Sequence, residues 1–401
     1  MLALTSVWTT ILLAAAVALG PLAIDMYLPA LPSMGESLAA STGQVQLTLS
    51  IYMAGFALAQ LICGPLADRF GRKPIMIGGF LLFAVASVIC ALATNIETLI
   101  LSRFLQALGG SAGPVLGRAA VRDIYSPREA AKIMAILASI MALAPAIAPT
   151  LGGFMVVGLG WQSIFLALGG YALIMAAVIA VGIPEPMRPE NRQSLRIGSL
   201  IKNYRAIASD ISFLGYTLVN SLTFAGLFAF LSGSSFVLID FLGVKPEHFG
   251  PFFACIVAGY IVGNLTAVRL GSRLAPDQIL VRGLVVAVAG GGLMAVLAVT
   301  QVYNAWAVIL PQTLFMIGVG MVLPQTMAGA LANFPRMAGS ASALFGFTQM
   351  VVAATIGALV GYFHDGTSLV MAATIATCAI AALASYLLLV QRHPAPGFEP
   401  A

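Results

Sequence analysis

The chain has 401 residues, of which 60% are hydrophobic and 8% are charged, whereas about 25% are charged in a typical soluble protein. A water-soluble protein of this length needs more polar surface, so the composition excludes an ordinary soluble enzyme and indicates a polytopic membrane protein. The net charge of +5 comes from basic residues in short segments between apolar runs. We therefore interpret them as topology determinants, and we expect no nucleic-acid partner.

The apolar runs predict an all-α membrane protein with twelve transmembrane helices, since about 20 apolar residues cross a bilayer. The first run lacks a basic n-region and a small-residue cleavage site, so we expect an uncleaved span rather than a signal peptide. In chain order the predicted spans are 7–30, 44–64, 75–94, 97–118, 131–157, 162–183, 212–235, 248–268, 279–300, 304–327, 338–362 and 368–391.

The Lys and Arg residues between the spans fall almost entirely on one side. With the N-terminus inside, only Lys245 lies in an outer connection, so the positive-inside rule places both termini in the cytoplasm. The longest polar segment follows the sixth span and separates two sets of six, with either a short interfacial helix over 196–209 or a solvated linker. The predicted division is an N-terminal six-helix bundle at 1–184, a cytoplasmic linker at 185–211, a C-terminal six-helix bundle at 212–392 and a cytoplasmic tail at 393–401.

The segment Gly64–Pro74 joins the second and third spans and reads G-P-L-A-D-R-F-G-R-K-P. Its glycines, prolines and net positive charge predict a short, tightly turning cytoplasmic loop. We expect Asp68 to accept hydrogen bonds from a neighbouring helix N-terminus, or to pair with an arginine such as Arg122 or Arg128, and so to gate the cytoplasmic side. The gating residues of this hypothesis are Gly64, Asp68, Arg69, Gly71 and Arg72.

Ionisable residues inside a bilayer are costly, so each one suggests a function. Asp25 is the only carboxylate within the first six spans, and the second six offer no clearly buried acid, because Asp277 is assigned to an inner loop. Asp25 is either an interfacial residue at the outer end of its span or a cavity-facing carboxylate that binds and releases a proton.

Arg103 lies inside the fourth span and keeps its charge, so it needs partners if it is buried. Asp25, backbone carbonyls, Gln60 and Gln106 are candidates, and snorkelling to the lipid head groups is the alternative. The fifth span adds Pro145 and Pro149, each of which removes a helical hydrogen bond, and the small pair Gly152 and Gly153, which allows a facing helix to approach.

Motifs for other chemistry are missing from the sequence. There is no phosphate-binding G-x-x-x-x-G-K-[ST] loop, no C-x-x-C pair and no local Ser–His–Asp signature. The three histidines lie in loops or the tail. We therefore expect a transporter rather than an enzyme, with no metal and no cofactor, driven by a proton gradient instead of ATP.

Three motifs resemble those of twelve-helix drug:proton antiporters of the major facilitator superfamily, and the resemblance covers nearly the whole chain. Gly64–Lys73 is similar to the loop between helices 2 and 3. Arg103–Gly109 is similar to the helix 4 motif whose arginine is linked to proton coupling. Ala148–Gly153 is similar to the helix 5 antiporter motif, although Ala148 replaces its usual first glycine.

Within this superfamily, Asp25–Pro32 and Arg118–Asp123 resemble the Bcr/CflA branch. The resemblance implies two pseudo-symmetric six-helix bundles and export of phenicol- or bicyclomycin-type compounds. It also assigns proton coupling and substrate contact to Asp25 and Arg103. Val17 stands where some multidrug relatives carry a second acid, which favours neutral or amphipathic substrates over strongly cationic ones.

The expected partners are a small-molecule substrate, protons and the lipid bilayer, and we expect a monomer in the bacterial inner membrane. An apolar cavity with a few polar groups suits drug-like ligands. A transporter of an endogenous metabolite or amino acid shares these features and remains the alternative, whereas a membrane receptor or enzyme lacks a supporting motif. The candidate cavity residues are Tyr27, Tyr52, Met53, Leu137, Met141, Asn220 and Phe224.

Overall fold

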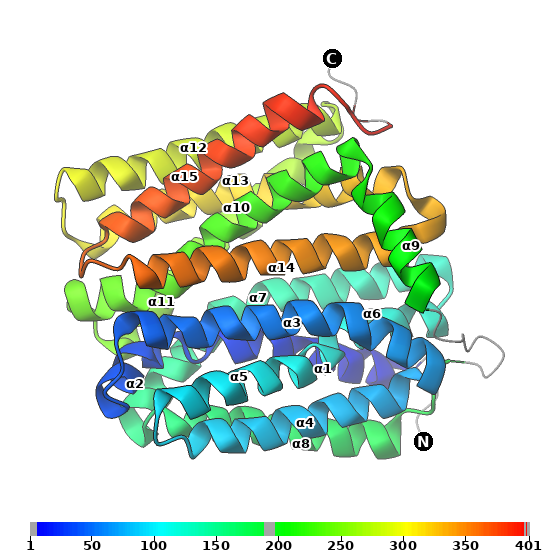
Figure 1. The fold of residues 1–401 in the computed structure, drawn as a ribbon, viewed down its shortest axis with the longest axis horizontal. Coiled ribbons are helices and arrows are strands. Elements are labelled where there is room, and N and C mark those ends of the chain that lie inside the picture. Colours follow the sequence, from blue (N-terminus) through cyan, green and yellow to red (C-terminus); the bar gives the residue numbers. More distant parts are fainter. Residues whose placement is uncertain (1–5, 188–196, 397, 399–401) are drawn as a thin grey trace. The chain divides into compact units, whose positions relative to one another are not determined.

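The computed structural model describes residues 6–187, 197–396 and 398, and every regular element in these ranges is helical (Figure 1). Twelve of the described helical segments are long and apolar enough to cross a membrane, and they match the twelve predicted spans in order. Several run past the predicted boundary, as in Thr42–Phe70 where 44–64 was expected. A helix continues to satisfy its backbone hydrogen bonds outside the hydrocarbon, so its end is not set by hydropathy alone.

The chain divides into two compact units. Unit 1 comprises Met1–Ser41, Ile51–Leu195 and Pro246–Gly250, and unit 2 comprises Thr42–Ser50, Arg196–Lys245 and Pro251–Ala401. The first turns of α3 are therefore grouped with unit 2, and the first turn of α11 with unit 1.

The first half of the chain carries eight α-helices, and α1 packs against α6, α7 and α8, while α4 packs against α5 and α8. Figure 1 shows α4 and α8 side by side. The elements are α1 (Val7–Asp25), η1 (Leu28–Ala30), α2 (Leu31–Ser37), α3 (Thr42–Phe70), α4 (Arg72–Ala91), α5 (Ile96–Gly110), α6 (Ala112–Ile124), α7 (Pro127–Leu159) and α8 (Gln162–Gly182).

In the second half, α10 packs against α13, α14 and α15, and α12 packs against α13 and α15. A short amphipathic helix, α9, precedes them inside the predicted linker, and its Ile207 is fully buried. The elements are α9 (Ile197–Ala208), α10 (Ile211–Ser235), η3 (Phe236–Phe241), α11 (Pro246–Leu270), α12 (Pro276–Val299), α13 (Ala305–Ala332), η4 (Pro335–Met337), α14 (Ala338–Tyr362), α15 (Leu369–Ser385) and η5 (Tyr386–Val390).

The structure corrects the expected loop at Gly64–Pro74. Helix α3 continues to Phe70 and α4 begins at Arg72, so the connection is the single residue Gly71. Gly71 has φ 102°, a conformation in which a side chain is strained. The predicted turn is therefore real but shorter than its composition suggested.

Asp277 is a second correction. It lies in the first turn of α12 rather than in a loop, and it is only 4% exposed. The hydroxyl of Tyr386 lies 2.8 Å from each of the two carboxylate oxygens of Asp277, which share the single hydroxyl proton in a bifurcated hydrogen bond. The second half of the chain thus contains a buried acid that the span boundaries had excluded, because the helix begins earlier than expected.

Candidate functional site

Asp25 ends α1 and is buried, with only 4% of its surface exposed. Its carboxylate makes no ion pair or hydrogen bond with any other residue in the described part of the chain. Helix α1 carries no other acidic or basic residue, so this carboxylate is an isolated ionisable group on an otherwise apolar helix. An unpaired acid in such surroundings is suited to exchange a proton.

Arg103 lies in α5 and is fully buried. Of its candidate partners, the guanidinium Nη1 donates to the backbone carbonyl of Ala23 at 3.2 Å and to the side-chain oxygen of Gln106 at 2.5 Å. Its Nε and Nη2 have no hydrogen-bond partner among the described residues, and neither does the hydroxyl of Tyr52. Arg103 therefore contacts the α1 backbone two residues before Asp25 but forms no ion pair with it.

Aromatic rings surround the Arg103 guanidinium. Its Cζ lies 4.3 Å from the ring centre of Tyr27, 4.2 Å from that of Tyr52 and 5.7 Å from that of Phe165. Phe165 in turn packs edge-on against Trp161, with ring centres 6.0 Å apart. Cation–π attraction from these rings stabilises the buried charge without neutralising it.

A polar chain extends this cluster into α4. The Gln106 amide nitrogen donates to the hydroxyl of Ser87 at 2.7 Å, and Ser87 donates to the backbone carbonyl of Phe83 at 2.7 Å. Gln106 is thereby held in the orientation in which its side-chain oxygen accepts from Arg103. Sequence inspection did not single out Ser87 or Phe165, because they come from α4 and α8 and carry no motif of their own.

A second polar cluster surrounds the turn at Gly71. Arg72 pairs with Asp68 at 2.6 Å, and its Nε donates to Asp123 of α6 at 2.9 Å. In the described residues, neither Arg122 nor Arg128 pairs with Asp68, contrary to one of the two expectations. Arg72 instead bridges the end of α3 and the end of α6, which ties two helices together.

Glu185 completes this cluster and was missed in the sequence. One of its oxygens accepts from the backbone N–H of Arg72 at 2.8 Å, and the other accepts from that of Lys73 at 3.1 Å. The ammonium of Lys73 donates to the carbonyl of Ala180 at 2.8 Å. Glu185 therefore caps the N-terminus of α4 although it lies 112 residues after Lys73. The positive end of the helix dipole stabilises its negative charge there.

The small residues of the fifth span serve a close helix contact. A Cβ added at Gly152 would overlap the carbonyl oxygen of Met26, and one added at Gly153 would overlap that of Pro246. Both Pro145 and Pro149 lie inside α7, which runs as one helix over Pro127–Leu159. The glycines thus permit α7 to lie against the chain just after Asp25.

The remaining cavity candidates are scattered. Met53 and Leu137 are buried, whereas Met141 is half-buried. Asn220 is buried in unit 2 and donates to the hydroxyl of Thr326 at 2.8 Å, and Phe224 one turn later is half-buried. Only Tyr27 and Tyr52 are brought together with Arg103.

Comparison with known proteins agrees with this architecture. The family model of the Major Facilitator Superfamily matches residues 13–358. The chain belongs to the Major Facilitator Superfamily. Its members are transporters rather than enzymes, and the superfamily fold accounts for the twelve spans in two six-helix bundles.

Several relatives align over most of their length. The chain is 36% identical to an uncharacterized MFS-type transporter, YdgK, of Bacillus subtilis (strain 168), over 93% of each chain. It is 31% identical to a bicyclomycin resistance protein homolog of Haemophilus influenzae, over 94% of each chain. It is 32% identical to a chloramphenicol resistance protein of Pseudomonas aeruginosa, over 88% of this chain and 83% of the relative. These names confirm the resemblance to Bcr/CflA-type drug antiporters.

A solved structure supports the fold alone. A bacterial homolog of the human lysosomal transporter Spinster, in an inward-facing and occupied conformation, superposes with a TM-score of 0.74. It is 17% identical and covers 95% of this chain and 96% of its own.

Proposed function

We propose that this transporter exports small, mostly neutral or amphipathic drug-like molecules of the phenicol or bicyclomycin type, in exchange for protons. The observation that carries the proposal is the buried, unpaired carboxylate of Asp25 at the end of a helix whose Ala23 carbonyl accepts a hydrogen bond from the buried Arg103. The relatives named for bicyclomycin and chloramphenicol resistance support the substrate class. Val17, an apolar residue two turns before Asp25, supports the preference for uncharged drugs.

In the proposed cycle, the N-terminal bundle (1–184) and the C-terminal bundle (212–392) alternate access to a central cavity. Asp25 takes up a proton on the outer side as the substrate leaves, and releases it on the inner side as the next substrate binds. Arg103, held by Gln106 and the aromatic rings, keeps a positive charge against the backbone of the helix that carries this acid. We propose that the cluster at Asp68, Arg72 and Glu185 stabilises the cytoplasmic end of the N-terminal bundle during the cycle.

We further propose a monomer in the bacterial inner membrane with both termini in the cytoplasm, powered by the proton gradient without a cofactor. One carboxylate that carries one proton against a neutral drug moves net charge. Transport should therefore respond to membrane potential as well as to the pH gradient.

Proteoliposomes with an imposed pH gradient test the proposal. We expect the purified protein to drive chloramphenicol transport, and Asp25→Asn to abolish the gradient-driven component while the variant remains monodisperse. Asp277→Asn is the matched control, because it neutralises the other buried acid and should retain gradient-driven transport. Full coupled activity of Asp25→Asn, or loss of coupling in Asp277→Asn alone, would contradict the assignment of Asp25.

A drug-susceptibility panel in a pump-deficient host tests the substrate class. We expect resistance to phenicols or bicyclomycin to rise on expression. If resistance stays unchanged while proton-coupled uptake or release of a metabolite or amino acid is measured, the chain transports an endogenous solute instead.

A further inference from the structure

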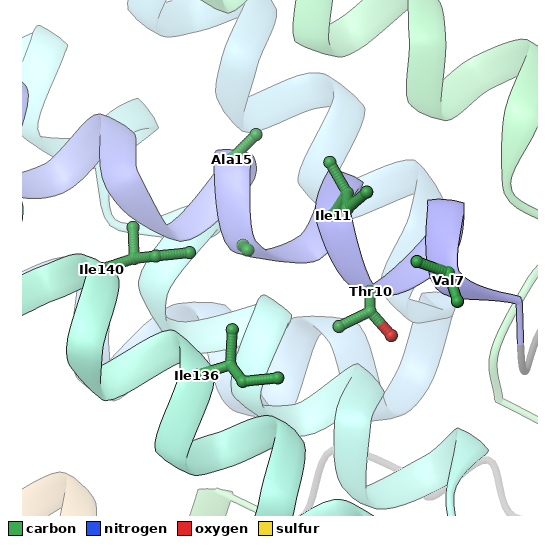
Figure 2. Close-up of a pocket in the computed structure, with 7 residues that line it drawn as sticks. Val7, Thr10, Ile11, Ala15, Ile136 and Ile140 are labelled. Atoms are coloured by element: carbon green, nitrogen blue, oxygen red, sulfur yellow. The ribbon is translucent and has the colours of Figure 1, made fainter.

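An open apolar groove of about 390 Å³ runs between α1 and α7 in unit 1, and neither Asp25 nor a residue of the cluster at Gly71 lines it. Figure 2 shows Ile136 and Ile140 of α7 pointing toward α1 across this groove. Its length along α1 is about 12 Å, from the helical rise between the first and last lining residues. The lining residues are Val7, Thr10, Ile11, Ala14, Ala15, Ile136 and Ile140.

The groove offers almost no polar group to a ligand. Its single hydroxyl, on Thr10, already shares a 3.0 Å hydrogen bond with the hydroxyl of Tyr125. A drug-binding pocket usually presents a few polar groups that orient its ligand. The groove therefore fits a hydrocarbon chain better than a drug-like molecule.

Two cations stand at one end of the groove. Arg128, Lys132, Ile136 and Ile140 follow one another at four-residue spacing, so they share one face of α7 and the stripe changes from basic to apolar. Arg128 and Lys132 are exposed. The nearby carboxylate of Glu129 accepts a 2.6 Å hydrogen bond from the Ser126 hydroxyl as part of the helix cap. It also feels the charge of Lys132 without forming a salt bridge with it, so Arg128 is the less compensated of the two cations.

This end of the groove also has the marks of a membrane interface. Trp8, next to Val7, is 64% exposed, and tryptophan is enriched at the level of the lipid head groups. Both α1 and α7 begin at this end, and the positive-inside rule assigns it to the cytoplasmic leaflet. Two basic side chains at the level of the lipid head groups, next to an apolar groove at the level of the acyl chains, match the charge and shape of an anionic lipid.

We propose that the groove between α1 and α7 binds an anionic phospholipid of the cytoplasmic leaflet, with one acyl chain along Ile136 and Ile140 and the head group at Arg128 and Lys132. The inference does not depend on which solute the protein transports. Bound lipid fills a channel that side chains leave open and joins α1, which carries Asp25, to α7.

Photocrosslinking of the full-length protein in phosphatidylethanolamine liposomes tests the site. The probe is phosphatidylglycerol with a photoreactive acyl chain, and a photoreactive phosphatidylcholine serves as the zwitterionic comparison. We expect crosslinks from the anionic probe on peptides that contain 7–15 and 136–140, and a fall in their yield as ionic strength rises. Equal crosslinking by the zwitterionic probe would overturn the proposal.

Variants separate the head-group contacts from the acyl-chain contacts. The double variant Arg128→Gln/Lys132→Gln should lower the anionic crosslink by up to about thirtyfold, since each cation near an anionic surface contributes about 1 kcal/mol. Its matched control, Arg269→Gln/Arg273→Gln, removes two exposed cations from unit 2 and should leave the yield unchanged. Ile136→Asn should lower the yield, whereas Leu143→Asn on the same helix, exposed and outside the groove, should not.

Two outcomes of these experiments would overturn the lipid-binding proposal. An unchanged yield in Arg128→Gln/Lys132→Gln would overturn the head-group assignment. Displacement of the probe by saturating chloramphenicol would show that the groove belongs to the drug pathway, and would also overturn the proposal. Because the salt dependence is measured on the unmodified protein, the test holds even if a variant fails to fold.

Discussion

Arg103 is a buried cation whose neighbours are aromatic instead of acidic. A carboxylate partner would neutralise it, whereas the rings of Tyr27 and Tyr52 stabilise it and leave its charge in place. Its hydrogen bond to the Ala23 carbonyl holds that charge against the helix that carries Asp25. Arg103 is thus held by the backbone of the helix that carries Asp25, and not by the Asp25 carboxylate itself.

This arrangement predicts different outcomes for two substitutions of Tyr52. Tyr52→Leu removes a ring that faces the guanidinium at 4.2 Å and should lower the free energy of unfolding by about 2 kcal/mol. Tyr52→Phe keeps the ring and should cost little, since the hydroxyl has no hydrogen-bond partner in the described part of the chain. Thermal unfolding of the purified variants in detergent measures both, and equal destabilisation would show that the ring face is not the stabilising group.

At the scale of elements, polar contacts at helix ends and one close helix contact position the helices of unit 1. Glu185 caps the first turn of α4 from beyond the end of α8, and Arg72 links α3 to α6 through Asp68 and Asp123. Next to Asp25, α7 approaches the carbonyl of Met26 so closely that only glycine fits at position 152. The first set of contacts fixes the ends of α3, α4 and α6, and the second fixes α7 against the chain that follows Asp25.

The close approach at Gly152 predicts a sharp contrast along one helix. Gly152→Ala places a methyl group on the Met26 carbonyl, so α7 must move away from the chain that follows Asp25, and stability and transport should both fall. Gly158→Ala on the same helix meets no atom within 4 Å and should be tolerated. Thermal unfolding and transport assays on the two variants make the comparison. Similar behaviour of both would show that the glycines matter through backbone flexibility and not through the contact.

At the scale of the whole molecule, each of the two compact units contains most of one half of the chain, while Thr42–Ser50 and Pro246–Gly250 are grouped with the opposite unit. Twelve spans with an inner N-terminus place the C-terminal end of the chain on the same side. The basic residues of the connections, with Lys245 as the exception, are distributed in agreement with that topology.

Reporter fusions test the predicted topology. A green fluorescent protein fused at the C-terminus should fluoresce, because it folds in the cytoplasm. Alkaline phosphatase fused after Lys245 should be active, because that connection is predicted to face the periplasm. A dark C-terminal fusion together with an inactive phosphatase fusion would show the opposite orientation.

Sequence alone determined the features that depend on composition and local spacing. The number and order of the spans and the candidacy of Asp25 and Arg103 as ionisable residues within the spans follow from the cost of polar groups in hydrocarbon, which acts on each segment separately. The turn at Gly71 follows from the local glycine and proline content. For the same reason the prediction failed where a helix extends beyond the hydrocarbon, as at Asp277, whose burial depends on the distant Tyr386.

Only the tertiary structure decided which partners those residues have. The sequence left several possible partners for Arg103, and in the structure Gln106 and the Ala23 carbonyl accept its hydrogen bonds. Nothing in the local sequence predicts that the ring of Phe165 packs on Arg103, or that Glu185 caps α4. The physical reason is that these contacts join helices far apart along the chain. Their geometry is set by how small residues let the helices approach, which local spacing does not specify.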